Sequence, residues 1–309
     1  MKYVGLQSQI WSNNTKSVLL LVMFPLVFYV LAWLFFFFMA PTEYRSLDST
    51  TGSFLMVFPW ITVAVALWFI IAWFSHTSMI NRATGSRTLD RKENKRVYNL
   101  VENLCIAAGM KMPAVHIIED DSLNAFASGI SDRTYTVSLS RGIINKLNDE
   151  ELEAVIAHEL THIRNRDVRL LIISIVFVGI FSFVSETMLR SLMYGGVRSR
   201  GKKGGGGSAQ IIALVLALIG LFLATLFRFA LSRKREYLAD AGSAELTRNP
   251  LALASALEKV SGDPTIEAVR RKDVAQMFIE NPQLSRKGSI NLFATHPPIA
   301  RRIQILRQF

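Results

Sequence analysis

Four apolar runs set the main constraint on this chain, because each must be buried in lipid or in protein. The first two, residues 18–40 and 54–74, are long enough to cross a hydrocarbon core of about 30 Å at a rise of about 1.5 Å per residue. Half of the residues are hydrophobic, which agrees with a membrane protein. The first run lacks the small-residue cleavage site of a signal peptide and the second follows almost at once, so we expect both to be retained as helices.

The other two apolar runs, residues 170–184 and 211–227, are shorter and enclose a polar loop with the glycine-rich tract 201–208, which predicts flexibility. If functional residues lie on both sides of this hairpin, its two ends must face the same compartment. Either both runs then cross the membrane or neither does. We favour crossing, because lipid is the simplest solvent for so many apolar residues; a buried or re-entrant hairpin is the alternative.

The basic residues predict orientation and partners. Lysines and arginines precede the first run and follow the second, while Arg45 alone lies between them, so the positive-inside rule places both ends of this pair in the cytoplasm. The excess that produces a net charge of +11 lies next to or between apolar runs, which favours anionic lipid headgroups over nucleic acid. Cys105 is the only cysteine, so no intramolecular disulfide is possible, in agreement with a cytoplasmic soluble part.

The segment 148–167 contains H-E-L-T-H, which places His158, Glu159 and His162 on one predicted helix. Positions four apart share a helix face, so the two imidazoles can meet one metal ion. In the H-E-x-x-H pattern the histidines hold zinc and the glutamate acts as a general base toward water. The alternative is a structural helix that carries two surface histidines and no metal.

The flanks of this motif indicate a helix that buries it. Asn148 is placed as an N-cap, with Glu151 three residues on to complete a capping box. Apolar residues then recur at spacings of three and four, and Glu159 falls near that apolar stripe. Burial of an unpaired carboxylate is costly, and a role in chemistry explains it better than packing does.

A pair of acidic residues further along the chain offers the rest of a metal site. A catalytic zinc keeps three protein ligands and one open position, so two histidines need a third partner. Glu236 and Asp240 lie four apart on a predicted helix after the last apolar run. Glu236 is the candidate third ligand, and Asp240 can accept a hydrogen bond from the free nitrogen of a ligating histidine. Taken alone, the pair fits a surface helix equally well.

The soluble segment before the zinc motif predicts a small α+β unit. Helical spacing covers residues 90–108 and ends at Gly109, while 114–118, 134–139 and 124–130 are predicted strands. A strand beside a zinc helix can hold an extended peptide through ladder hydrogen bonds. An ordinary half-buried strand is the alternative.

Three motifs together carry a resemblance to a known family: H-E-L-T-H-I-R-N-R-D, R-K-R-E-Y-L-A-D-A-G-S-A and A-T-H-P-P-I-A-R-R-I. They resemble the HtpX-type integral-membrane zinc metalloproteases, which are related to the prenyl-protein CaaX endopeptidases. The resemblance runs from N-A-F-A to the C-terminus, with two spans ahead of it. It implies a gluzincin-like domain that faces the cytoplasm and holds one Zn²⁺ per chain on His158, His162 and Glu236.

The resemblance also implies roles for other positions. Glu159 would be the catalytic base. His296, in T-H-P-P, would lie near the site and steady a developing oxyanion, with a structural role ahead of Pro297 as the alternative. The implied substrate-edge strand consists of Asn124, Ala125, Phe126 and Ala127.

The predicted fold class is membrane α-helical plus α+β, with about four transmembrane helices and a cytoplasmic zincin-like metalloprotease domain. The expected division is a membrane region at 1–80, catalytic parts at 81–168 and 232–309, and the apolar hairpin at 169–231. Together with the resemblance, it implies a bacterial inner-membrane endopeptidase that degrades misfolded or damaged membrane proteins during stress, in contact with lipids and in cooperation with other membrane proteases. The alternatives are a CaaX-type processing peptidase and a non-catalytic zinc-containing membrane scaffold.

Overall fold

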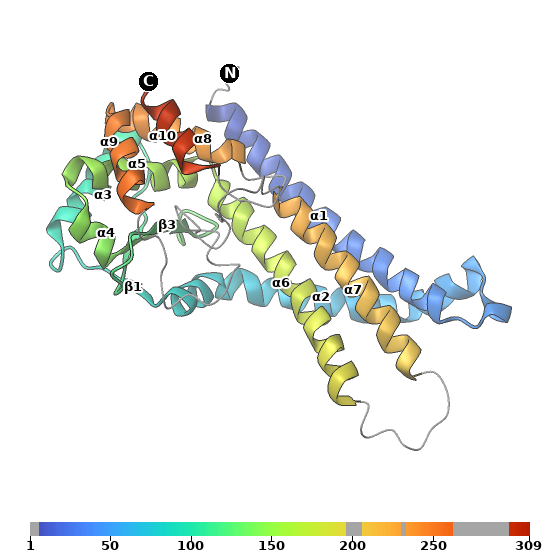
Figure 1. Ribbon diagram of the computed structural model, residues 1–309. Helices are drawn as coiled ribbons and strands as arrows, with labels where there is room; N and C mark the ends of the chain where they lie inside the picture. Colours follow the sequence, from blue (N-terminus) through green and yellow to red (C-terminus); the bar gives the residue numbers. More distant parts are fainter. Residues whose placement is uncertain (1–5, 196–205, 230–232, 262–296) are drawn as a thin grey trace. The chain divides into compact units, whose positions relative to one another are not determined.

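The structure is a computed structural model that describes residues 6–195, 206–229, 233–261 and 297–309 (Figure 1). The chain divides into two compact parts. The sheet unit comprises residues 1–15, 75–172 and 229–309, and the helical unit comprises residues 16–74 and 173–228.

The helical unit contains most of four long helices: α1 (Leu6–Met39), α2 (Leu47–Thr84), α6 (Asp167–Gly195) and α7 (Gly206–Phe229). A short 3-10 helix, η1 (Thr42–Tyr44), joins the first two. By length and composition, three helical segments among the described residues are able to cross a membrane: Trp11–Met39, Leu47–Thr84 and Asp167–Arg190. The apolar part of α7, Ile211–Thr225, is shorter, so its crossing stays a prediction.

Aromatic stacking and a close glycine contact hold the helical unit together. Phe24 of α1 stacks on Phe177 of α6 with ring centroids 3.9 Å apart, and Phe28 stacks on Phe181 at 4.7 Å. On α7, a Cβ added at Gly220 would lie 2.2 Å from the ring of Phe181, so the helix approaches to a distance that only glycine allows. These contacts make an apolar core inside a unit whose outer side chains are also apolar.

Helix α6 is longer than the apolar run at residues 170–184 from which it was predicted. The helix does not end with the apolar residues at 184 but continues through Ser185 and Glu186 to Gly195. Helix continuation depends on backbone hydrogen bonds and propensity rather than on hydropathy, so a polar turn extends it. The glycine tract predicted to be flexible is helical from Gly206 onward, and residues 201–205 lie outside the described part.

The sheet unit is built on four strands in the order β1-β2-β4-β3. The strands are β1 (Ser86–Thr88), β2 (Ala114–Ile118), β3 (Ala125–Ser128) and β4 (Thr136–Ser140). β2 and β4 are parallel, whereas β1 and β3 are antiparallel to their neighbours, so β3 lies at one edge. The prediction for β2 is confirmed; β3 and β4 differ from their predicted ranges by one to two residues at the ends, and three-residue β1 was too short to predict.

Helices pack around this sheet and around each other. α3 (Lys95–Ala108) starts at the N-cap Asn94 and ends at Gly109, whose φ of 61° is the left-handed conformation that glycine favours. α4 (Arg141–Lys146) leads into α5 (Asp149–Arg164), which contacts β3 and β4. The remaining helices, which surround α5 or pack on its neighbours, are α8 (Arg233–Thr247), α9 (Pro250–Val260) and α10 (Ile299–Leu306).

Candidate metal centre and active site

Helix α5 carries the H-E-x-x-H motif into the interior of the sheet unit. The predicted capping box is confirmed: the Asn148 side chain accepts from the backbone of Glu151, and the Glu151 carboxylate accepts from the backbone of Asn148. His158 and Glu159 are almost completely buried, while the His162 side chain is 14% exposed. The motif therefore lies on the packed side of the helix and keeps one partly open ligand.

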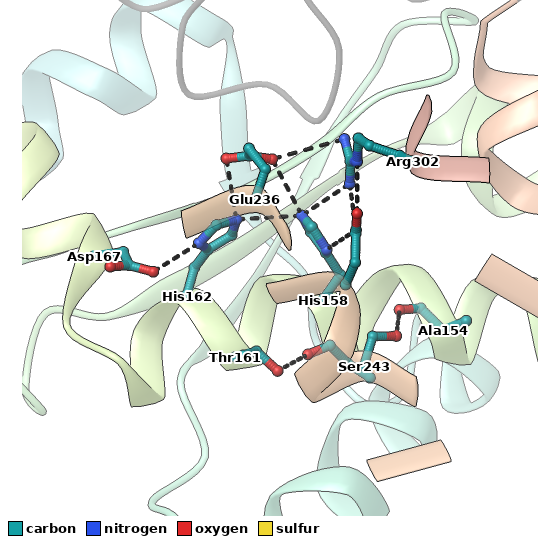
Figure 2. A network of polar contacts seen from close by, with 10 residues as sticks. Ala154, His158, Thr161, His162, Asp167, Glu236, Ser243 and Arg302 are labelled. Atoms are coloured by element: carbon teal, nitrogen blue, oxygen red, sulfur yellow. Dashed lines mark hydrogen bonds and ion pairs between the residues drawn. The ribbon is translucent and has the colours of Figure 1, made fainter. Parts of the chain in front are cut away.

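Helix α8 brings Glu236 to the two histidines (Figure 2). The His158 and His162 Nε2 atoms are 3.2 Å apart, and the Glu236 carboxylate oxygens lie 3.7 Å and 3.6 Å from them. Ligands of a tetrahedral zinc at about 2.0 to 2.1 Å are separated by about 3.3 Å, so this spacing fits one ion. The donor set, two imidazoles and a carboxylate, is also one that catalytic zinc uses.

Small side chains allow α8 to come this close to α5. A Cβ added at Gly242 would lie 2.4 Å from Cγ2 of Thr161, so the two helices touch at this point without room for another carbon. One residue further on, the Ser243 hydroxyl donates to the carbonyl oxygen of Ala154 at 2.7 Å (Figure 2). These contacts fix the position of α8 and thereby the position of Glu236.

Asp240 lies one turn after Glu236 and contacts the outer nitrogen of the first histidine. Its Oδ1 is 3.1 Å from Nδ1 of His158, so the imidazole presents Nε2 to the other ligands. Burial would raise the pKa of the Asp240 carboxyl, but the charge of Arg302 and the hydrogen bond from His158 hold it at about 2. The predicted partner role of Asp240 is consistent with this geometry.

The carboxylates make this pocket favourable for a cation. Burial lowers the pKa of His158, but hydrogen bonds to Asp240 and Glu236 outweigh burial and raise it to about 9. A site that stabilises a proton on an imidazole in this way also stabilises a metal cation, which would compete with the proton for the same nitrogen.

Two contacts of the site were not predicted from the sequence. Arg302, from α10, is fully buried and hydrogen-bonded to Asp240, with Nη1 3.7 Å from Glu236. Asp167, at the start of α6, has Oδ2 3.2 Å from Nδ1 of His162. Both residues lie inside motifs that carry the family resemblance, but only the folded chain shows which side chains they meet.

Glu159 lies between the metal ligands and the edge strand. Burial raises the pKa of its carboxyl, and the charges of His158 and His162 partly offset that rise. The backbone N–H of Ala127 in β3 donates a hydrogen bond to the carboxylate. A carboxyl with a raised pKa is closer to the working pH of a general base.

The edge strand β3 directs part of its backbone away from the sheet. The Ser140 N–H donates to the carbonyl of Asn124 at 2.9 Å, which sets the hydrogen-bonded positions of the β3–β4 pair. In an antiparallel pair such positions alternate, so the backbone groups of Ala125 and Ala127 point away from β4. The hydrogen bond from Ala127 to Glu159 agrees with this register. Phe126 is fully buried in the same strand, and His296 lies outside the described residues.

The family model and the curated relatives agree on one family. Residues 91–309 match the model of peptidase family M48. A protease HtpX homolog from Bacteroides fragilis is 58% identical over the whole of both chains, and one from Dictyoglomus turgidum is 41% identical over 79% of this chain and 82% of its own. The crystal structure of S. mikatae Ste24p is 17% identical with a TM-score of 0.49, over 96% of this chain and 66% of that chain.

The membrane-capable helices, the α+β unit, the family match and the HtpX homologs define a membrane-bound zinc metalloprotease, and neither alternative considered above is favoured. The chain belongs to peptidase family M48.

Proposed function

We propose that this protease hydrolyses peptide bonds of misfolded or damaged membrane proteins at one zinc ion held by His158, His162 and Glu236. The observation that carries the proposal is the spacing of the three ligand atoms, all within 4.8 Å of one another, beside the buried carboxylate of Glu159. The reaction class follows from the donor set and the adjacent base.

The protein's own groups divide the work of hydrolysis. When bound, zinc lowers the pKa of water toward about 7 and polarises the scissile carbonyl. Glu159 accepts the proton of the attacking water and passes it to the leaving amine. Asp240 and Asp167 hold the two imidazoles through their Nδ1 atoms, so that each Nε2 is aimed at the same point.

The edge strand β3 is the proposed docking site for the substrate backbone. The carbonyls of Ala125 and Ala127 face away from β4 and can accept hydrogen bonds from an extended peptide that adds itself as a further strand. Both residues are buried in this structure, so the peptide must displace the groups that cover them. Such binding reads main chain rather than side chains, and it requires the substrate to be unfolded locally. We therefore assign Asn124, Ala125, Phe126 and Ala127 to substrate binding and expect loosely folded proteins as substrates.

The chain order of the proposed ligand helix and a membrane-capable helix supports membrane-derived substrates. The proposed ligand helix α5 ends only a few residues before the membrane-capable segment Asp167–Arg190. The charge bias around the first two spans supports a sheet unit that faces the cytoplasm at a bacterial inner membrane. We also propose that His296 steadies the developing oxyanion, because it lies in the T-H-P-P motif.

The test is purification of the whole chain in detergent without chelator, followed by cleavage of casein as a loosely folded substrate. We expect one zinc per chain by metal analysis, loss of cleavage with a zinc chelator, and recovery when zinc is returned. Cleavage that persists at full rate in the metal-stripped protein would exclude the proposed mechanism.

A further inference from the structure

A buried asparagine near the start of the first helix contacts a carboxylate beside the candidate metal centre. Asn13 of α1 has no exposed surface. Its side-chain amide donates to Oδ1 of Asp167 at 2.6 Å and to the carbonyl oxygen of Asn165 at 2.8 Å. Asn13, Asn165 and Asp167 all belong to the sheet unit. One amide group therefore contacts the turn between α5 and α6 at two points.

The carboxylate of Asp167 connects this amide to a proposed metal ligand. Oδ1 receives the hydrogen bond from Asn13, and Oδ2 lies 3.2 Å from Nδ1 of His162 (Figure 2). A carboxylate that partners a ligating histidine fixes both the ring orientation and the tautomer. The carboxylate must itself be held, because rotation about its own side-chain bonds would move the oxygen that faces the imidazole.

The adjacent asparagine provides a natural comparison. Asn14 is only half-buried, and its Oδ1 accepts from Nη1 of Arg166 at 3.2 Å. Arg166 is exposed and has a φ of 60°, so this contact supports the same turn without touching the carboxylate. Substitution of Asn14 therefore removes only support of the turn, whereas substitution of Asn13 also removes the hydrogen bond that orients Asp167.

We infer that Asn13 is a positioning residue for the metal centre, acting on His162 through Asp167. This inference rests on the proposed role of His162 as a zinc ligand. It extends the functional unit beyond residues 91–309, the part that matches the peptidase family, to a side chain in the first helix. The chemistry is general: an amide donor fixes a carboxylate, and the carboxylate fixes the ligand.

The test measures zinc release from the full-length protein in detergent. Substitution of the direct partner, Asp167→Ala, should lower zinc affinity about 10- to 100-fold, the usual effect of removing a residue that holds a metal ligand, and should accelerate transfer of zinc to a chromophoric chelator to a similar extent. Asn13→Ala acts one step further away, so we expect about 5-fold faster release. Asn14→Ala is the matched control and should release zinc at the wild-type rate. With casein, Asn13→Ala should lower kcat and leave KM unchanged.

A double variant distinguishes positioning from general support of the fold. If Asn13 acts through Asp167, Asn13→Ala adds nothing to the release rate in the Asp167→Ala background. An effect of equal size in both backgrounds, or an Asn13→Ala variant that behaves like Asn14→Ala, overturns the inference. Should Asn13→Ala fail to fold, Asn13→Leu, which keeps the shape without the donor, is measured in the same way.

The proposed function has its own readout in these experiments. Wild-type protein with one zinc and a His162→Ala variant with little zinc support the ligand set, whatever Asn13→Ala does. Wild-type protein that binds no zinc overturns the proposed site itself.

Discussion

The guanidinium of Arg302 donates two hydrogen bonds to the carboxylate of Asp240, from Nη2 at 2.6 Å and from Nε at 2.9 Å. Both groups are buried, and Asp240 in turn contacts His158. Removal of the arginine would leave a buried carboxylate without its main charge partner, which costs about 3–5 kcal/mol in comparable pairs. The pair therefore links the packing of α10 to the orientation of a proposed zinc ligand.

We predict that Arg302→Ala lowers the unfolding temperature and weakens zinc retention. The exposed neighbour Arg301 lies on the same helix, so Arg301→Ala is the matched control and should change neither quantity. Thermal unfolding in detergent and zinc content after dialysis are the measurements. An Arg302→Ala protein as stable as the control would show that α10 does not support the site.

For the proposed base, we predict that Glu159→Gln keeps its zinc and cleaves casein about 10²- to 10⁴-fold more slowly, the usual contribution of a general base. Glutamine matches the shape of glutamate but cannot accept the proton. Glu153→Gln, on the same helix and half-buried, should cleave at the wild-type rate. Cleavage by Glu159→Gln at the wild-type rate would refute the assignment.

For the third ligand, we predict that Glu236→Ala lowers the zinc stoichiometry well below one per chain. Glu236 supplies one of the three ligand atoms in the cluster, and two histidines alone make a weak site. Glu245→Ala removes an exposed carboxylate from the same helix and serves as the control. The zinc content of both variants is measured by metal analysis after gel filtration. A Glu236→Ala protein that holds as much zinc as Glu245→Ala would refute Glu236 as a ligand.

The contact between α5 and α8 is tested by adding one carbon. Gly242→Ala would place Cβ 2.4 Å from Cγ2 of Thr161, so we expect α8 to shift and stability to fall by about 1–3 kcal/mol, as overpacked cores do. Gly179→Ala, which meets no atom within 4 Å, is the control. Thr161→Ala in the Gly242→Ala background should restore part of the lost stability and zinc binding. If Gly242→Ala is as stable as the control, the contact is not tight.

The last prediction concerns pH. Burial raises the pKa of Glu151. Hydrogen bonds from Lys259, Ser255 and the backbone of Asn148 lower this pKa by more than burial raises it, so the net shift is downward. Since the folded pKa lies below the unfolded value of about 4.3, the carboxylate stabilises the fold at neutral pH and loses this effect as pH falls through the folded pKa. Glu151→Gln should therefore destabilise the protein by about 2 kcal/mol at pH 7.

Thermal unfolding of wild type and Glu151→Gln from pH 7 to pH 3 tests the direction of the Glu151 pKa shift. The difference in stability between wild type and Glu151→Gln should shrink below about pH 4. A difference that grows with acidity would contradict the downward shift.

Local signals predicted much of the fold. The capping box at Asn148, the apolar spacing of α5 and the glycine at 109 are encoded within one or two turns, so the start of α5 and the end of α3 were predicted correctly. The start of α3 was predicted at residue 90, whereas the helix begins at Lys95 after its N-cap Asn94. The short strand β1 and the full length of α6 were not predicted. β1 has three residues and no period to read, and α6 continues past its apolar stretch where hydropathy alone predicts an end.

In the candidate site, too, the features set by local sequence were predicted and those set by long-range contacts were not. Short spacings placed His158 with His162, and Glu236 with Asp240, on shared helix faces, and the structure brings the two pairs together. The roles of Asn13, Asp167 and Arg302 depend on which distant segments meet after folding. No local pattern encodes that an asparagine in α1 meets the turn after α5, so such contacts appear only in three dimensions.

The chain order of the site residues has a consequence for biogenesis. The two histidines of α5 are synthesised before α6 and α7, whereas Glu236 and Arg302 follow both hydrophobic helices. A nascent chain therefore carries a two-histidine site, too poor in donors to retain a catalytic ion, until its membrane helices have been synthesised. The proposed ligand set is therefore completed only after both hydrophobic helices have been synthesised.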